Sequence, residues 1–102
     1  MAMAPIEYRG YLIKPISHAV QPHFIKGQFV YWGYIPVYLT GPYPGAHAGP
    51  GATWSPTIGG VKTMIDCLHE AGPEPSRLPS VEAEVHRAWN TRFWALMNER
   101  RT

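Results

Sequence analysis

FVYWGYIPVYLTGPYPGAHAGPG, residues 29–51, combines the strongest strand signal of this chain with its most irregular segment. Eight of the first eleven residues are aromatic or β-branched, which is typical of a β-strand. The eleven residues 41–51 hold four glycines and three prolines, which favour a stiff loop. Because Pro36 has no N–H to donate to a ladder, we expect this strand at a sheet edge or at a bend.

Residues 28–40 form either one long bent strand or two shorter strands hinged near Gly33. Both faces of this segment are apolar when it is read at period two. One face carries Val30, Trp32, Tyr34, Pro36 and Tyr38, and the other carries Phe29, Tyr31, Gly33, Ile35, Val37 and Leu39. Because the helices cover one sheet face, we expect one aromatic row to face solvent unless the second helix folds over it.

The segments on either side of this stretch complete the strand-rich part of the chain. Residues 6–15 are rich in aromatic and branched side chains and predict a first strand, in which Gly10 indicates a bulge. Residues 16–27 are expected to form a long connection. Residues 52–54 can add a short third strand after the loop.

A first helix is predicted over residues 55–72. The run from Ser55 to Thr57 supplies a capping hydroxyl and a proline, which is tolerated in a first turn. Apolar residues then recur at three- and four-residue spacing, which forms a single stripe. These residues are Ile58, Val61, Met64, Ile65 and Leu68. The Gly-Pro pair at 72–73 ends the helix.

A second helix is predicted over residues 80–101, with Ser80 as its N-cap. Its apolar stripe is Val81, Val85, Ala88, Trp89, Phe93, Leu96 and Met97. Trp94 lies off this stripe and is expected to be exposed in a monomer. An exposed aromatic ring on a terminal helix favours a partner, so we also expect a homodimer through residues 85–97 as an alternative.

The order of these elements predicts an α+β fold. We expect a small antiparallel sheet of two to three strands, followed by two helices packed on one face. The length of 102 residues suits a single domain over residues 1–102, with a strand-rich part at 1–54.

The composition indicates which cellular compartment suits the protein. Cys67 is the single cysteine, which excludes an intramolecular disulfide and suits a reducing compartment. The first residues lack a basic segment followed by an apolar one, so a secretory signal is not indicated. No apolar run approaches the roughly 18 to 20 residues that a membrane span needs. We therefore expect a cytoplasmic protein without a membrane partner.

Charge does not indicate a dedicated nucleic-acid binder. Nine basic and seven acidic residues leave a net charge of +2. The balance is +2 over residues 1–50, −1 over 51–79 and +1 over 80–102. No segment contains the dense basic run that such binders carry.

Two segments of the chain resemble a known group of proteins. The pattern Y-R-G-Y-x-I-x-P spans residues 8–15, and W-S-x-T-I-x-x-x-K-x-x-I-D spans residues 54–66. Together with the aromatic strand between them, they resemble small uncharacterised ββ(β)α proteins of bacteria and their phages and plasmids. The resemblance covers about half of the chain. It departs from the group at 16–27, in the expanded Gly/Pro loop and in the second helix. It implies a short sheet packed on one helix and favours a partner-binding protein over an enzyme.

Few residues have the sequence spacing that a catalytic, metal or phosphate site requires. Cys67 and His69 point about 200° apart on a helix, so they cannot act together as nucleophile and base. The histidines at 18, 23 and 47 lack the spacing of a structural zinc site. The glycines of the loop are followed by no Lys-Ser/Thr pair, which a phosphate loop needs. We predict no catalytic residue, no metal and no cofactor.

The aromatic strand and the adjacent loop predict a recognition surface. Tyrosine and tryptophan are favoured anchors in protein interfaces. We expect the contacts to come from Tyr31, Trp32, Tyr34, Tyr38, Tyr43, His47 and Trp94. The leading interpretation is a non-enzymatic protein that binds another protein.

Two alternatives remain open. The aromatic row could stack the bases of a single-stranded nucleic acid, with Arg9, Lys14 and Lys26 beside it. The second alternative is a small enzyme that uses Cys67 or a cluster of histidines.

Overall fold

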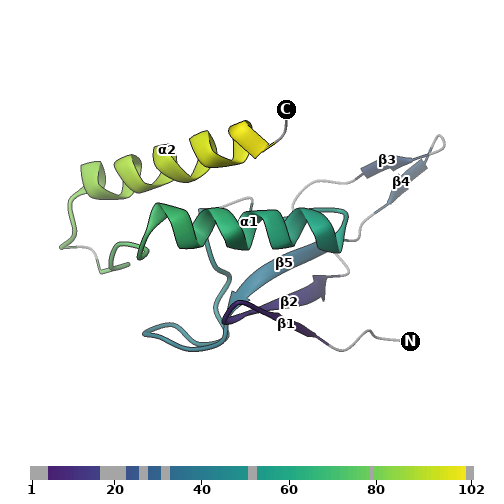
Figure 1. Cartoon of the computed structure of the whole chain (residues 1–102), viewed down its shortest axis with the longest axis horizontal. Coiled ribbons are helices and arrows are strands. Elements are labelled where there is room, and N and C mark those ends of the chain that lie inside the picture. The colour runs from purple at the N-terminus through teal and green to yellow at the C-terminus, as the bar shows by residue number, and fades with distance from the viewer. Residues whose placement is uncertain are drawn as a thin grey trace. The chain divides into compact units, whose positions relative to one another are not determined.

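The computed structural model describes residues 5–16, 23–25, 28–30, 33–50, 53–78 and 80–100. Within them the chain forms β1 (Ile6–Tyr8), β2 (Tyr11–Ile16), β3 (His23–Ile25), β4 (Gln28–Val30), β5 (Gly33–Tyr38), α1 (Ile58–Ala71) and α2 (Ala83–Arg100) (Figure 1). Strands β1, β2 and β5 form an antiparallel sheet in that order, and β3 pairs with β4 in a separate sheet. The predicted α+β class, with an antiparallel sheet followed by two helices, is confirmed.

Contacts along the chain divide it into two compact units, Met1–Ile65 and Asp66–Thr102. The boundary falls inside α1, so the first half of this helix belongs to the sheet unit and the second half to the α2 unit. That the whole chain acts as one domain stays a prediction.

The single strand expected over residues 6–15 is instead a hairpin. β1 and β2 pair antiparallel, with Tyr8 opposite Tyr11, so only Arg9 and Gly10 lie in the turn. Both have positive φ, 49° and 86°, as the central residues of a type I′ turn do. The prediction of a bulge at Gly10 was therefore wrong. Positive φ at two successive residues reverses the chain and forms a turn instead.

The segment 28–40 contains two strands, as one of the two interpretations proposed. β4 ends at Val30, and β5 begins at Gly33 in a different sheet. The long connection expected over 16–27 contains β3, which pairs with β4. The sequence analysis did not predict β3, a strand of three residues. The short strand expected at 52–54 is replaced, in the described residues 53 and 54, by irregular backbone.

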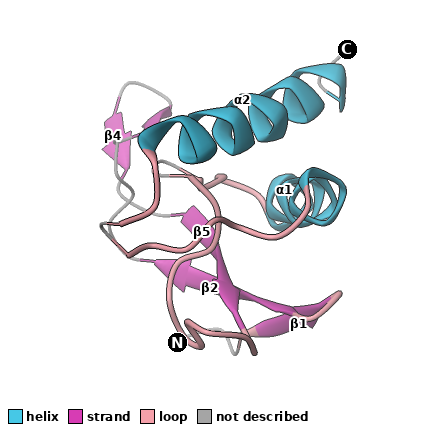
Figure 2. Ribbon diagram, turned by 90° about the vertical axis from the view of Figure 1, so that its left-hand side faces the viewer, coloured by secondary structure: helices cyan, strands magenta, loops and turns pink. Residues whose placement is uncertain are grey.

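The core of the first unit lies between the sheet and α1 (Figure 2). Ile13, Val61 and Ile65 are fully buried there. Partly buried residues surround them, namely Ile6, Tyr8, Tyr11, Tyr34 and Ile58. Burying a side chain of this size contributes about 1.5–3 kcal/mol, so these contacts are the main support of the sheet on α1.

The start of α1 is held by hydroxyl groups close by in the chain. The Thr57 hydroxyl accepts a hydrogen bond from the Gly60 N–H at 3.0 Å, which makes Thr57 the N-cap. The Ser55 hydroxyl accepts one from the Thr57 N–H at 3.2 Å. A Cβ on Gly60 would lie 2.0 Å from the Ser55 Oγ and 2.8 Å from its Cβ. Because glycine has no Cβ, Gly60 permits the Ser55 side chain to lie close to the first turn of α1.

In the second unit α2 buries a narrower stripe than its sequence predicts. Trp89, Phe93 and Met97 are buried, whereas Val85 is 47% exposed. The helix also begins at Ala83, three residues after the predicted cap. The Val81 N–H bonds to the Leu78 carbonyl, which closes a turn before the helix can start.

The end of α1 is held by side chains of α2. The Trp89 indole N–H donates to the Gly72 carbonyl at 3.1 Å, and the Arg92 guanidinium donates to the Ala71 carbonyl at 2.7 Å. Carbonyls at a helix C-terminus have no partner within the helix, so these donors satisfy them. The Arg100 guanidinium adds an ion pair with Glu70 at 2.6 Å.

Candidate binding surface

The Gly/Pro loop folds back along the outer edge of β5. The Tyr38 N–H donates to the Ala46 carbonyl at 3.0 Å, and the Gly45 N–H donates to the Tyr38 carbonyl at 2.8 Å. Two residues after Ala46, the Ala48 N–H donates to the Pro36 carbonyl at 2.9 Å. Backbone pairing with β5 therefore orders the described part of the loop, residues 41–50.

Pro36 fits in β5 because of the direction in which its backbone points. Tyr34 and Tyr38 direct their N–H and C=O groups away from β2, toward Ser55 and the loop. Pro36 lies between them and shares this direction, so its missing N–H leaves the ladder with β2 intact. β5 is the end strand of its sheet, as expected from this proline.

Internal contacts hold the return of the loop toward α1. His47 donates from Nε2 to the Thr53 carbonyl over 2.7 Å, and the Thr53 hydroxyl bonds to the Pro50 carbonyl. Ala48 and Thr53 are fully buried. A Cβ on Gly49 would lie 3.0 Å from the Thr53 hydroxyl oxygen, and its φ is +89°. His47 is thus half-buried and stabilises the loop through its hydrogen bond to Thr53.

Three tyrosines and the loop meet at one end of the sheet. Tyr8 lies opposite Tyr11 in the hairpin, and Tyr11 lies opposite Tyr38 in the next pair of strands. The rings of Tyr11 and Tyr38 are 5.5 Å apart, centre to centre. The loop leaves β5 directly after Tyr38 and carries the half-buried Tyr43. We call this region the tyrosine end and define it by Tyr8, Tyr11, Tyr38 and Tyr43.

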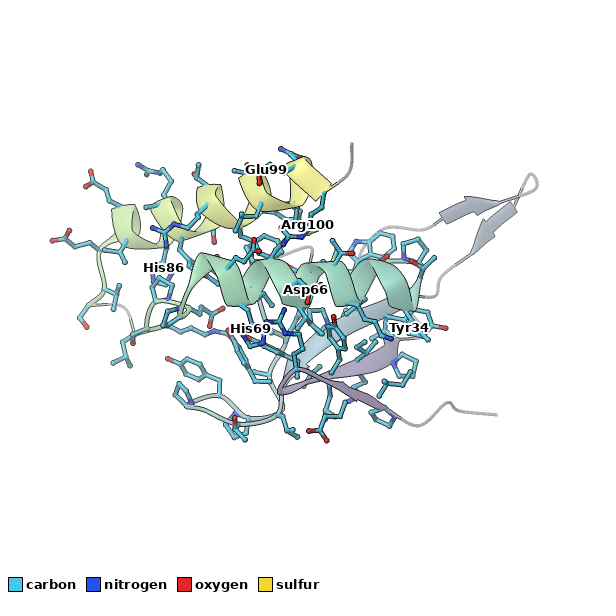
Figure 3. The ribbon with its side chains drawn as sticks, viewed as in Figure 1. Tyr34, Asp66, His69, His86, Glu99 and Arg100 are labelled. Carbon is cyan, nitrogen blue, oxygen red and sulfur yellow. The ribbon has the colours of Figure 1, made fainter. Side chains whose placement is uncertain are left out.

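Tyr34 lies at the opposite end of β5. It pairs with Ser55 and packs against the core beneath α1, beside the first turn of that helix (Figure 3). Its ring is half-buried, so much of its area is used in packing. Of the aromatic row predicted from period two, Tyr34 therefore faces α1, and Tyr8 and Tyr11 of the neighbouring strands pack against the same core.

Three further contact residues were predicted. Tyr31 and Trp32 lie outside the described residues. Trp94 belongs to the second unit, where its half-buried ring meets Phe93 edge-on at 5.0 Å and 82°. This contact accounts for part of the ring that was expected to be exposed. A homodimer through residues 85–97 stays a prediction.

Sequence reasoning missed Tyr8 and Tyr11 as members of the surface. Their neighbours Arg9 and Gly10 are the signal that could have found them, since X-Gly between alternating strands predicts a two-residue turn. The Nζ of Lys62, from α1, lies 5.4 Å from the centre of the Tyr8 ring. Such a position permits a cation–π contact and brings a positive charge to the tyrosine end.

Cys67 is poorly suited to act as a nucleophile. Its side chain is fully buried on α1. Burial raises the pKa of its thiol above the ordinary value of 9.0, although Arg100 acts in the opposite direction. The thiolate is the reactive species, and burial of this kind disfavours it. His69, two residues further along α1, is exposed.

The part of the chain that the structure describes shows no metal site, because no three of its His, Cys, Asp or Glu residues cluster as ligands would. Likewise, neither described helix combines the length and apolar character of a membrane span. No family model, no curated protein and no solved structure matches the chain.

Proposed function

We propose that the protein acts by binding another protein through the tyrosine end, and that it is not an enzyme. The observation that supports this most is the pairing of the Gly/Pro loop with β5, which orders the backbone of the loop that carries Tyr43. Tyr8, Tyr11, Tyr38 and Tyr43 are all half-buried, so each has both a supported side and an accessible side.

A surface of this kind suits protein recognition for a thermodynamic reason. Tyrosine offers a large amphipathic contact area and has only two side-chain torsions to immobilise. Ordering the loop before the partner arrives removes part of the entropy cost that binding would otherwise carry. Both effects leave more of the contact energy available for affinity.

Photo-cross-linking in the cells that express the protein tests this proposal. Benzoylphenylalanine is placed at Tyr43 in one variant and at Ala95, an exposed position on α2, in a matched control. We expect one or a few protein adducts that form from position 43 and not from position 95. The same adducts from both positions, or none from position 43, would contradict the proposal.

Single-stranded nucleic acid is the second candidate, and the position of Lys62 over Tyr8 favours it. Stacking aromatics beside cations are the usual elements of such sites. Lys14 contributes less than expected, because it follows Ile13 and so lies on the sheet face away from the core. Anisotropy of labelled single-stranded DNA and RNA at about 50 and 200 mM salt tests this candidate, since phosphate contacts weaken steeply with salt.

A further inference from the structure

We infer that the loop tip, residues 40–45 of the Gly/Pro loop, inserts into a pocket of the protein partner that is lined by aromatic side chains. The tip is the part of the tyrosine end that carries Tyr43. This inference rests on the proposed protein-binding function and adds the shape and chemistry of the partner's site. It is carried by the closed backbone of the loop, by two exposed proline rings and by the lack of charged residues along the loop.

The loop is closed at its base by two hydrogen bonds to one residue of β5. The Gly45 N–H donates to the Tyr38 carbonyl at 2.8 Å, and the Tyr38 N–H donates to the Ala46 carbonyl at 3.0 Å. Figure 1 shows the chain leaving the end of β5 and projecting beyond the sheet before it returns. The tip is thus a convex element, and protruding loops of this kind insert into concave sites.

A type II turn orders the tip itself. The Ala46 N–H donates to the Tyr43 carbonyl at 3.1 Å, across Pro44 and Gly45. The φ of Gly45 is 83°, as the third residue of a type II turn requires, and proline is common at the second residue. The tip is therefore ordered before a partner arrives, which lowers the entropy cost of binding.

The two prolines of the tip have accessible rings. Pro42 and Pro44 are exposed, whereas Pro36 in β5 and Pro50 at the end of the loop are buried. The backbone of the turn accounts for Pro44, but Pro42 precedes the turn. Two neighbouring ring faces are therefore available to a partner, in contrast to the buried prolines that support the loop.

The tip offers a partner no charged side chain. Residues 27–61 contain no Asp, Glu, Lys or Arg. Phosphates and carboxylates are usually bound by lysine and arginine, and the tip carries neither. The groups that a partner can recognise here are uncharged, which favours an apolar protein pocket over a nucleic acid.

Aromatic side chains fit such a surface best. Proline-rich segments dock into aromatic-lined grooves, where their stiff backbone loses little conformational freedom. Proline supplies a backbone carbonyl but no N–H, so a partner meets acceptors at Pro42 and Pro44. Tryptophan and tyrosine supply both a flat apolar ring and a hydrogen-bond donor. A pocket lined by these residues therefore complements the tip.

The test maps the partner's side of this contact. Benzoylphenylalanine is placed at Thr40, an exposed residue of the tip, and is activated in the cells that express the full chain. Mass spectrometry then identifies the partner residues around the adduct. The same experiment is repeated with Pro42→Ala, with Pro44→Ala and with Pro73→Ala, an exposed proline outside the loop that serves as a matched control.

We expect the adduct to fall in a segment of the partner that contains tryptophan, tyrosine or phenylalanine. Alanine at those partner residues should reduce the adduct yield by at least about threefold, and so should Pro42→Ala or Pro44→Ala. Pro73→Ala should leave the yield unchanged. A reduced yield from a variant whose circular dichroism spectrum and urea midpoint match those of the unchanged chain separates a lost contact from a damaged fold.

Several results would overturn the inference. They are an adduct in a partner segment without aromatic residues, an unchanged yield in both loop variants, or an equal loss in Pro73→Ala. If position 43 captures a protein while position 40 captures none, or while the loop prolines have no effect, the proposed function survives and this inference alone fails. If neither position captures a protein, or if nucleic acid is recovered instead, both fail.

Discussion

Helix α1 is stabilised at its two ends by partners at very different distances along the chain. At the start, the Thr57 hydroxyl caps Gly60 and the Ser55 hydroxyl supports Thr57, all within six residues. At the end, Trp89 and Arg92 donate to carbonyls 17 and 21 residues away. The first end can form wherever its local sequence is present, whereas the second needs α2 in place.

This difference separates two sources of stability in one helix. A local cap contributes about 1 kcal/mol and loses little chain entropy when it forms. A cap from a distant side chain must also offset the closure of a long loop, and buried area supplies that energy. We therefore expect substitutions of buried α2 residues to destabilise the end of α1 most. The stability of its start should depend on its own hydroxyls and glycines.

The largest effect is expected from Trp89→Ala, which removes a buried ring and the donor to Gly72. Loss of a buried aromatic side chain costs about 3–5 kcal/mol of unfolding free energy. Urea unfolding followed by circular dichroism measures it. Trp89→Phe keeps one aromatic ring but loses the N–H and part of the buried area, so it should cost at least about 1 kcal/mol and less than Trp89→Ala. Equal losses in the two variants would mean that the hydrogen bond, and not the buried ring, secures this end.

Alanine substitutions at the two adjacent glycines near the start of α1 should change the unfolding free energy in opposite directions. A Cβ at Gly60 would overlap Ser55, so Gly60→Ala should lower the unfolding free energy by about 1–3 kcal/mol. A Cβ at Gly59 would meet nothing within 4 Å, so Gly59→Ala should raise it by up to about 1 kcal/mol. Chemical denaturation of both variants decides this, and a change of the same sign in both would refute the close approach.

The N-cap gives a smaller effect. Thr57→Ala removes the acceptor for the Gly60 N–H and should cost about 1 kcal/mol. Thr57→Ser keeps the hydroxyl and should retain most of this stability. The shift in the urea midpoint measures both variants. Equal midpoints for Ala and Ser would show that the hydroxyl does not cap the helix.

The smallest effect at neutral pH concerns Cys67. Burial raises the pKa of its thiol in the folded state, so the unfolded chain loses this proton first as the pH rises. The unfolding free energy should therefore fall as the pH increases above about 9, because the folded state then binds more protons than the unfolded state. Arg100→Gln should steepen the fall, since Arg100 lowers this pKa.

Cys67→Ala is the control for this experiment, since it removes the thiol and keeps a small apolar side chain. Its unfolding free energy, measured by urea titration from about pH 8 to 10, should lack the difference in slope attributed to Cys67. An identical pH dependence in Cys67→Ala and the wild-type protein would assign the effect to other groups.

The features that sequence reasoning predicted well are those produced by neighbours in the chain. The apolar stripe of α1 from Val61 to Leu68 is buried as expected, and the helix begins at a hydroxyl cap and stops before Gly72. The edge position of β5 followed from Pro36. Each of these signals acts over about four residues, the reach of one helical turn or one turn of a loop.

The candidate surface was predicted less completely. Tyr38 and Tyr43 were identified, but Tyr8 and Tyr11 join them only through the pairing of β1, β2 and β5. Tyr34, four residues from Tyr38 in the same strand, packs against the same core as Tyr8 and Tyr11 but lies beside Ser55, at the other end of β5. A pattern of period two shows which residues share a face, and it does not show which face a helix covers.

The sequence by itself therefore determined the class of the fold, the extent of α1 and the strand that ends in the Gly/Pro loop. The tertiary structure decided that residues 6–15 turn back on themselves, that the loop returns along β5, and that α2 buries one narrow stripe. Local propensity and capping act between residues already close in the chain, so they can be read from it. Strand pairing and helix packing join distant residues, and only the folded chain establishes which of them meet.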